Sequence, residues 1–258
     1  MADLVLTRLA GTGDEPALLL VGPSLGTDVA TLWGAVASRL GGVEVVGWDL
    51  PGHGRSPAAT GSFSVADLAD VVRTRAADHA AGRPTTYAGV SVGGAVGFLL
   101  AADPGQVTRV ATLASAPRLG EPSSWAERAE RVRRAGTPAL VDGSAGRWFA
   151  PGFLERDPAT GNDLLLRLCE VDDECYALTC EALAAYDARP LLADVRVPLL
   201  VVAGEHDPVV PPVLAAAAAD AVTGARFEMM PGVAHLPPAE DPAATATLLT
   251  THLLEETA

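Results

Sequence analysis

The pentapeptide Gly-Val-Ser-Val-Gly at residues 89–93 constrains the fold of this chain more than any other feature. A strand-like run precedes it at residues 85–88, and an apolar, helix-like run follows at residues 95–102. A sharp turn between a strand and a helix strains the backbone at its apex, so the residues beside the apex must lack bulk. This is the form of a nucleophile elbow, which exposes a serine hydroxyl above a sheet at the positive end of a helix. The pattern predicts that Ser91 is a nucleophile.

Strand-like and helix-like segments alternate along most of the chain. This alternation predicts an α/β fold, with a mostly parallel sheet covered by helices on both faces. Functional loops should then lie at the C-terminal ends of the strands. The strands are expected at residues 17–21, 43–48, 85–90, 107–113, 198–203 and 225–230, and helices at 64–80, with Ser64 as N-cap, 213–221 and 243–254.

One segment breaks the alternation. Residues 118–190 contain no convincing strand and several helix-like pieces. We expect residues 1–117 and 191–258 to form one core, which consists of the sheet and the helices that cover it. Residues 118–190 should form a helical cap, or lid, which is inserted late in the sheet and covers the strand ends.

A serine nucleophile needs a base, and the base needs an acid to orient it. Asp207 and His235 each follow directly after a predicted strand. In α/β folds whose nucleophile lies at such an elbow, the triad residues follow one another along the chain in the order serine, acid, histidine. The order Ser91, Asp207, His235 agrees with this. These residues are therefore the predicted catalytic triad, and Glu205 is the alternative acid.

The other four histidines have structural interpretations. His53 lies in a tight loop and is expected to bridge backbone groups. His206 adjoins Asp207 and should point away from it. His79 and His252 fall on predicted surface helices and should be solvated.

An acyl-transfer site of this kind needs two backbone N–H groups as an oxyanion hole. Val92, directly after the nucleophile, should supply one of them. The loop at residues 22–28, after the first predicted strand, should supply the other, with Leu25 as the expected donor and Ser24 as the next choice.

Composition excludes several classes of function. The formal net charge of −14 disfavours binding to nucleic acid or to an anionic membrane. All 18 basic residues are arginines, so lysine Schiff-base chemistry is excluded. No run of about 18 apolar residues is present to span a membrane, and the first residues lack the basic and apolar regions of a signal peptide. We expect a cytoplasmic protein that is a monomer or a small homo-oligomer.

The three cysteines, Cys169, Cys175 and Cys180, lie within twelve positions of one another. An odd number in a chain with no secretion signal argues against a disulfide framework. Their spacing does not match a zinc site, so no metal and no cofactor are expected. Their simplest interpretation is that of small buried apolar side chains.

Four segments of the chain resemble the α/β-hydrolase superfamily: the elbow, the loop at 49–56, residues 204–208 and the loop around His235. Within it, the chain most resembles the 3-oxoadipate enol-lactonases of the β-ketoadipate pathway. Those enzymes carry a loop similar to Ser-Leu-Gly-Thr, which occupies residues 24–27 here, and residues 147–151 and 180–183 are also similar to theirs. Val92 is a departure, since the lactonases usually carry Met or Leu at this position.

The resemblance implies hydrolysis of 3-oxoadipate enol-lactone to 3-oxoadipate through an acyl-enzyme, in aromatic-compound catabolism. This substrate carries a free carboxylate, so an acidic protein needs a local cation in the pocket. Arg147 is the expected partner, because a guanidinium suits a carboxylate, with Trp148 and Ser24 beside it in the substrate site. A solvated helix face is expected for the row Arg128, Arg131, Arg133 and Arg134, which is interleaved with Glu127 and Glu130.

Other functions are compatible with the same residues. A general carboxylesterase, another lactonase or a cofactor-free haloperoxidase would keep the triad and change the pocket. A catalytically silent ligand-binding protein would keep only the fold. Hydrolysis of an uncharged ester as fast as of the carboxylated lactone would favour the esterase, and tight binding without turnover would favour the silent protein.

Overall fold

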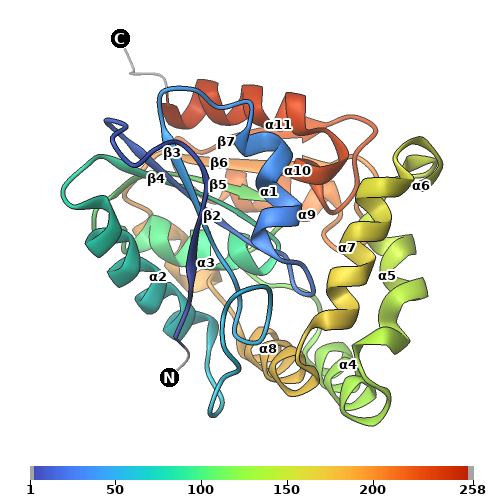
Figure 1. The fold of residues 1–258 in the computed structure, drawn as a ribbon. Coiled ribbons are helices and arrows are strands. Elements are labelled where there is room, and N and C mark those ends of the chain that lie inside the picture. Colours follow the sequence, from blue (N-terminus) through green and yellow to red (C-terminus); the bar gives the residue numbers. More distant parts are fainter. Residues whose placement is uncertain (1–2, 255–258) are drawn as a thin grey trace.

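A seven-stranded sheet organises residues 3–254, the part of the chain that this computed structural model describes (Figure 1). The strands lie in the spatial order β1-β3-β2-β4-β5-β6-β7. β1 pairs antiparallel with β3, and every other neighbouring pair is parallel, so the predicted mostly parallel α/β sheet is confirmed. The strands are β1 (Leu6–Ala10), β2 (Leu18–Gly22), β3 (Glu44–Trp48), β4 (Thr85–Val90), β5 (Val107–Leu113), β6 (Leu199–Gly204) and β7 (Arg226–Met230).

Helices cover both faces of the sheet. On one face α1 (Val29–Ala37) packs against α10 (Pro237–Glu240) and α11 (Pro242–Leu249). On the other face α2 (Val65–Ala80) packs against α3 (Val92–Ala102), and Figure 1 shows the strands between the two groups. The sandwiched strands β2, β3 and β4 are buried at every position, as expected for strands covered on both sides. Two further elements follow in the chain, α9 (Pro212–Asp220) beside β6 and η3 (Thr250–Leu254) beside β5.

Local signals explain where the helices begin. The predicted N-cap Ser64 accepts a hydrogen bond from the Asp67 amide, and the Asp67 carboxylate accepts one from the Ser64 amide, which is a complete capping box.

α1 and the edge strand β1 were not predicted. α1 is capped by Asp28, whose side chain accepts from the Thr31 amide.

A helical segment separates β5 from β6 in the chain. Its helices α4 to α8, coloured yellow-green to gold in Figure 1, lie together beside the sheet. Within it α4 packs along α8, and α5 packs along α7. We call residues 122–185 the cap segment; a domain division at residues 118 and 190 stays a prediction. Its elements are α4 (Pro122–Ala135), η1 (Thr137–Leu140), α5 (Val141–Trp148), α6 (Phe153–Arg156), α7 (Pro158–Glu170) and α8 (Asp173–Ala185), and η2 (Arg189–Asp194) follows before β6.

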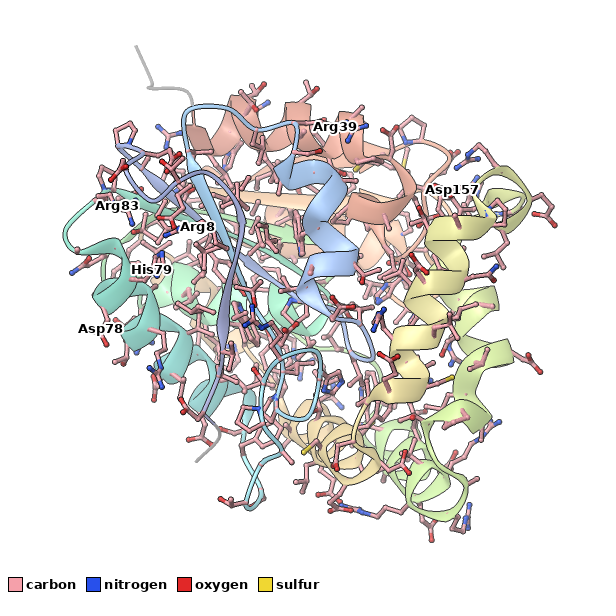
Figure 2. All side chains as sticks on the ribbon, in the orientation of Figure 1. Arg8, Arg39, Asp78, His79, Arg83 and Asp157 are labelled. Atoms are coloured by element: carbon pink, nitrogen blue, oxygen red, sulfur yellow. The ribbon has the colours of Figure 1, made fainter. Side chains whose placement is uncertain are left out.

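A buried charge cluster lies at the edge of the sheet where β3 begins. The Glu44 carboxylate is fully buried and contacts Arg8 at 2.7 Å, Arg83 at 2.8 Å and His79 at 3.1 Å. Figure 2 shows Arg8, His79 and Arg83 on the side of the molecule away from the cap segment. No helix within residues 3–254 is long and apolar enough to cross a membrane.

Candidate active site

The strand–turn–helix predicted at residues 89–93 is present between β4 and α3. Ser91 has φ 53° and ψ −112°, a strained conformation for a residue with a side chain. A Cβ on Gly89 would collide with the Gly93 backbone, and one on Gly93 would lie 2.7 Å from the carbonyl oxygen of Pro23. Both glycines are therefore required by close backbone approach. Ser91 is fixed further by its amide, which donates to Leu113 at 2.9 Å.

Asp207 and His235 meet at the C-terminal ends of β6 and β7. His235 Nδ1 lies 2.9 Å from Asp207 Oδ2, and both side chains are buried. The other oxygen, Oδ1, accepts hydrogen bonds from the amides of Val209 and Val210 at 2.8 and 3.0 Å. The carboxylate is thus held in place and orients the imidazole. With Nδ1 engaged, Nε2 is the ring nitrogen left to accept a proton.

Ser91 and His235 line one small cavity of about 40 Å³. Among the described residues, no hydrogen bond joins the Ser91 hydroxyl to the His235 ring; such bonds are often long before substrate binds. Eight further residues line this cavity with Ser91 and His235. Its lining consists of Ser24, Leu25, Ser91, Trp125, Arg128, Arg147, Trp148, Tyr176, Val209 and His235.

Larger hollows lie elsewhere on the molecule. Three of them, with volumes of about 510, 370 and 470 Å³, are lined by neither Ser91 nor His235. The small cavity is the candidate site, because it alone among these four joins a strained serine to an oriented histidine.

The amides predicted as the oxyanion hole are available. In residues 3–254 neither the Leu25 nor the Val92 amide donates to a protein acceptor. The loop with Leu25 is tied to the elbow, since the Gly93 amide donates to the Pro23 carbonyl at 2.9 Å. Thr27 closes the loop by donating its amide and its hydroxyl to the Ser24 carbonyl. Two unpaired donors beside Ser91 are the arrangement that oxyanion stabilisation needs.

The cap segment contributes the cations of the cavity. Arg147 and Trp148, at the end of α5, both line it as predicted, and the Trp148 carbonyl accepts a hydrogen bond from the His235 amide at 3.1 Å. Burial, and then the charge of Arg128, lower the pKa of Arg147. The cap segment therefore contacts the candidate base directly.

The prediction of a solvated helix face was wrong for Arg128. Arg128 lines the cavity, and its Nε donates to the Tyr176 hydroxyl at 2.7 Å. Arg134 on the same helix is exposed, as predicted. A signal for the difference exists in the sequence, because Trp125 and Val132 stand three before and four after Arg128 and place it on the apolar side of α4.

The remaining histidines lie outside the cavity lining. His53 is buried with Nδ1 2.9 Å from the Pro51 carbonyl, and burial lowers its pKa to about 4. His206 is exposed beside Glu205, as predicted. His79 contacts the buried Glu44. The prediction that His252 is solvated was wrong, because η3 packs against β5 and buries the ring.

The three cysteines are free thiols, of which Cys169 is exposed while Cys175 and Cys180 are buried. Burial raises the pKa of Cys175 to about 11 and that of Cys180 to about 12, so both stay protonated at neutral pH. Cys175 packs against Gly52, where an added Cβ would lie 2.8 Å from its sulfur. The buried cysteines therefore serve as packing residues.

The class of protein is defined by a mostly parallel sheet in which a strained serine follows β4, an aspartate follows β6 and a histidine follows β7. The chain belongs to the alpha/beta hydrolase family, whose sequence model matches residues 17–248. It is a hydrolase of this family.

Within the family, the predicted resemblance to enol-lactonases is confirmed. The chain is 36% identical over 201 residues to 3-oxoadipate enol-lactonase 2 of Acinetobacter baylyi, which covers 77% of this chain and 74% of that protein. The crystal structure of the enol-lactonase from Burkholderia xenovorans LB400 superposes with a TM-score of 0.92 at 30% identity, covering 98% of this chain and 97% of that one. A pimeloyl-[acyl-carrier protein] methyl ester esterase of Pectobacterium carotovorum is 27% identical over 239 residues, 88% of this chain and 89% of that protein.

Proposed function

We propose that this protein hydrolyses 3-oxoadipate enol-lactone to 3-oxoadipate, a step of aromatic-compound catabolism. The observation that carries the proposal is the 2.9 Å contact between His235 and Asp207 at the cavity that Ser91 also lines. The similarity to two enol-lactonases supports this substrate over other esters.

In the proposed reaction, His235 Nε2 takes the proton of Ser91 while Oγ attacks the lactone carbonyl. The amides of Leu25 and Val92 stabilise the oxyanion, and loss of one such donor typically costs about 3–4 kcal/mol of transition-state stabilisation. The ring C–O bond then breaks, and the leaving enolate takes the proton held by His235 to form an enol, which tautomerises to the ketone and leaves His235 neutral. Water deprotonated by His235 finally releases the acyl group as a carboxylate and restores Ser91.

The substrate carboxylate is proposed to bind Arg147, with Trp148 and Ser24 beside it. All three line the cavity. In this acidic chain a guanidinium at the site supplies the local positive charge that a carboxylated lactone requires.

We further propose that residues 118–190 act as a lid over a core of residues 1–117 and 191–258. The cavity of about 40 Å³ is well below the ~300 Å³ at the lower end of ordinary ligand pockets. Admission of a lactone then requires the cap segment to move, because Trp125, Trp148 and Tyr176, which help to close the cavity, all belong to it.

A general carboxylesterase is the second candidate. It is favoured by the similarity to the methyl ester esterase and by the aromatic side chains in the cavity lining. The two functions differ in whether the distant carboxylate of the substrate is needed for fast turnover.

The test is turnover of the enol-lactone, followed by its ultraviolet absorbance, and of a neutral aryl acetate. We expect fast hydrolysis of the lactone and a drop in kcat/KM of about 10⁴-fold or more in Ser91→Ala. The matched control is Ser62→Ala, which removes an exposed loop hydroxyl. Ser91-dependent cleavage of the aryl ester alone would leave the esterase, and no turnover of either would leave a ligand-binding protein.

A further inference from the structure

Two arginines in the cavity lack an acidic partner. Among residues 3–254, neither Arg128 nor Arg147 forms an ion pair with a carboxylate. The chain has 32 acidic residues for its 18 arginines, so partners are abundant. Arg133, on the same helix as Arg128, pairs with both Glu174 and Glu181. The two arginines that line the cavity therefore hold positive charge that no carboxylate of the described chain neutralises.

Arg128 is held in place by a neutral residue. Its Nε donates to the Tyr176 hydroxyl at 2.7 Å, and its guanidinium carbon lies 5.5 Å from the centre of the Tyr176 ring. Tyr176 is fully buried and stacks on the ring of His53, with the ring centres 6.3 Å apart. Nη2 reaches Ser144 at 3.5 Å, whereas Nη1 has no protein hydrogen-bond partner in the described chain. The guanidinium group of Arg128 is thus held in place while its Nη1 remains available to donate to a ligand.

The two positive charges oppose each other in a partly desolvated place. Arg147 is half-buried and forms no hydrogen bond or ion pair with a described residue. Burial and the charge of Arg128 are the two largest causes that lower its pKa. Two like charges in one cavity destabilise the empty site, and an anion bound between them removes that cost.

We propose that Arg128 and Arg147 together form one carboxylate subsite, which selects substrates with an anionic group away from the carbonyl that Ser91 attacks. Tyr176 is the positioning residue that holds Arg128 for this role. The inference rests on the proposed function for the identity of the substrate, and it adds a second arginine and its support to the single cation expected from the sequence.

The variants that test the subsite are Arg128→Gln, Arg147→Gln and Tyr176→Phe. Arg134→Gln is the matched control, since it removes an exposed arginine from the same helix. Removal of one charge-assisted hydrogen bond corresponds to roughly a 10–100-fold effect. We expect KM for the enol-lactone to rise by this factor in Arg128→Gln, and to rise by more than KM for a neutral aryl acetate, which carries no anionic group for the subsite to bind.

Tyr176→Phe separates positioning from charge. It keeps the ring under Arg128 and removes only the hydroxyl acceptor, so KM for the lactone should rise less than in Arg128→Gln. Arg128→Lys keeps the charge and should recover part of the lost affinity. Retained hydrolysis of the aryl acetate shows that each variant is folded. An unchanged KM for the lactone in Arg128→Gln overturns the subsite.

A second readout keeps the subsite separate from the proposed substrate. Adipate is used as a competitive inhibitor of aryl acetate hydrolysis by the wild type and the variants. If the wild type does not hydrolyse the enol-lactone, the proposed function fails. A higher inhibition constant for adipate in Arg128→Gln than in Arg134→Gln then still supports the subsite. Equal constants in those two variants overturn it.

Discussion

At the scale of single residues, the base is held by a buried carboxylate that the sequence motifs did not single out. Glu240 accepts hydrogen bonds from the amides of Ala234 at 2.9 Å and Leu236 at 3.2 Å, on either side of His235. Its second oxygen accepts from the Ala150 amide in the cap segment at 2.7 Å. One carboxylate therefore fixes the loop of the base and joins it to the cap.

Glu240→Gln should lower both stability and kcat. The side-chain amide of glutamine has one acceptor oxygen, whereas both oxygens of the Glu240 carboxylate accept hydrogen bonds from backbone N–H groups. In the variant the NH₂ group must therefore point at a backbone N–H group, and that hydrogen bond is lost. Loss of a hydrogen bond to a charged group costs about 1.5–3 kcal/mol. We expect the free energy of unfolding to fall by a corresponding amount, which lowers the midpoint temperature of thermal unfolding. We also expect kcat to fall by a larger factor than the factor by which KM changes. The exposed Glu155→Gln is the control, and equal kcat in the two variants would show that Glu240 does not position His235.

At the scale of elements, the elbow could be predicted because its requirements are local. The close approach of Gly89 to the Gly93 backbone and the apolar runs on either side lie in one short stretch of sequence, whereas the contact of Gly93 with Gly22 and Pro23 does not. The loops after β6 and β7 were predictable for the same reason. The spacing from Trp125 and Val132 indicates only which side of α4 carries Arg128; its hydrogen-bond partner Tyr176 was not predictable, since it lies 48 residues further along the chain. β1 was missed because it is a short, half-exposed edge strand without a continuous apolar run.

Gly93→Ala tests whether the elbow also shapes the oxyanion hole. The new Cβ would lie 2.7 Å from the backbone at Gly22 and Pro23, so the loop that carries Leu25 must shift. Displacement of one oxyanion donor should reduce kcat by about 10²–10³-fold. Gly34→Ala in α1 is the control, because open space surrounds its added methyl group and a helical alanine stabilises by about 0.5–1 kcal/mol. A kcat close to the wild-type value in Gly93→Ala would show that this glycine does not shape the oxyanion hole.

At the scale of the whole molecule, the sheet places chemistry and a stabilising charge cluster at opposite edges. Ser91, Asp207 and His235 follow the C-terminal ends of β4, β6 and β7, whereas Glu44 is the first residue of β3. In a parallel sheet these two sets of strand ends lie at opposite edges. The cluster can therefore be changed without contact with the cavity.

Glu44 should contribute stability that depends on pH. Burial acts to raise the pKa of its carboxyl, but hydrogen bonds from Arg8, Arg83 and His79 outweigh it, and the net pKa lies below the ordinary 4.5. A carboxyl with a lowered pKa in the folded state stabilises the protein above its unfolded pKa, and this contribution is lost as pH falls through the folded pKa. The stabilisation is thus complete at neutral pH and declines below about pH 4.5.

Glu44→Gln should consequently destabilise the protein by about 1.5–3 kcal/mol at pH 7, because it removes the buried negative charge that contacts the partly exposed side chains of Arg8, Arg83 and His79. The difference from wild type should shrink as pH falls below 4.5, as measured by urea unfolding across the acid range. Asp187→Asn is the control. The pKa of Asp187 is also lowered, to about 2 by Arg189, but this ion pair is exposed and should contribute less than about 1 kcal/mol.

Because the charge cluster around Glu44 and the cavity share no residue, kcat/KM of Glu44→Gln at pH 7 should stay at the wild-type value. A difference in stability that is constant from pH 7 to pH 3 would mean that packing, and not the charge of Glu44, carries its contribution.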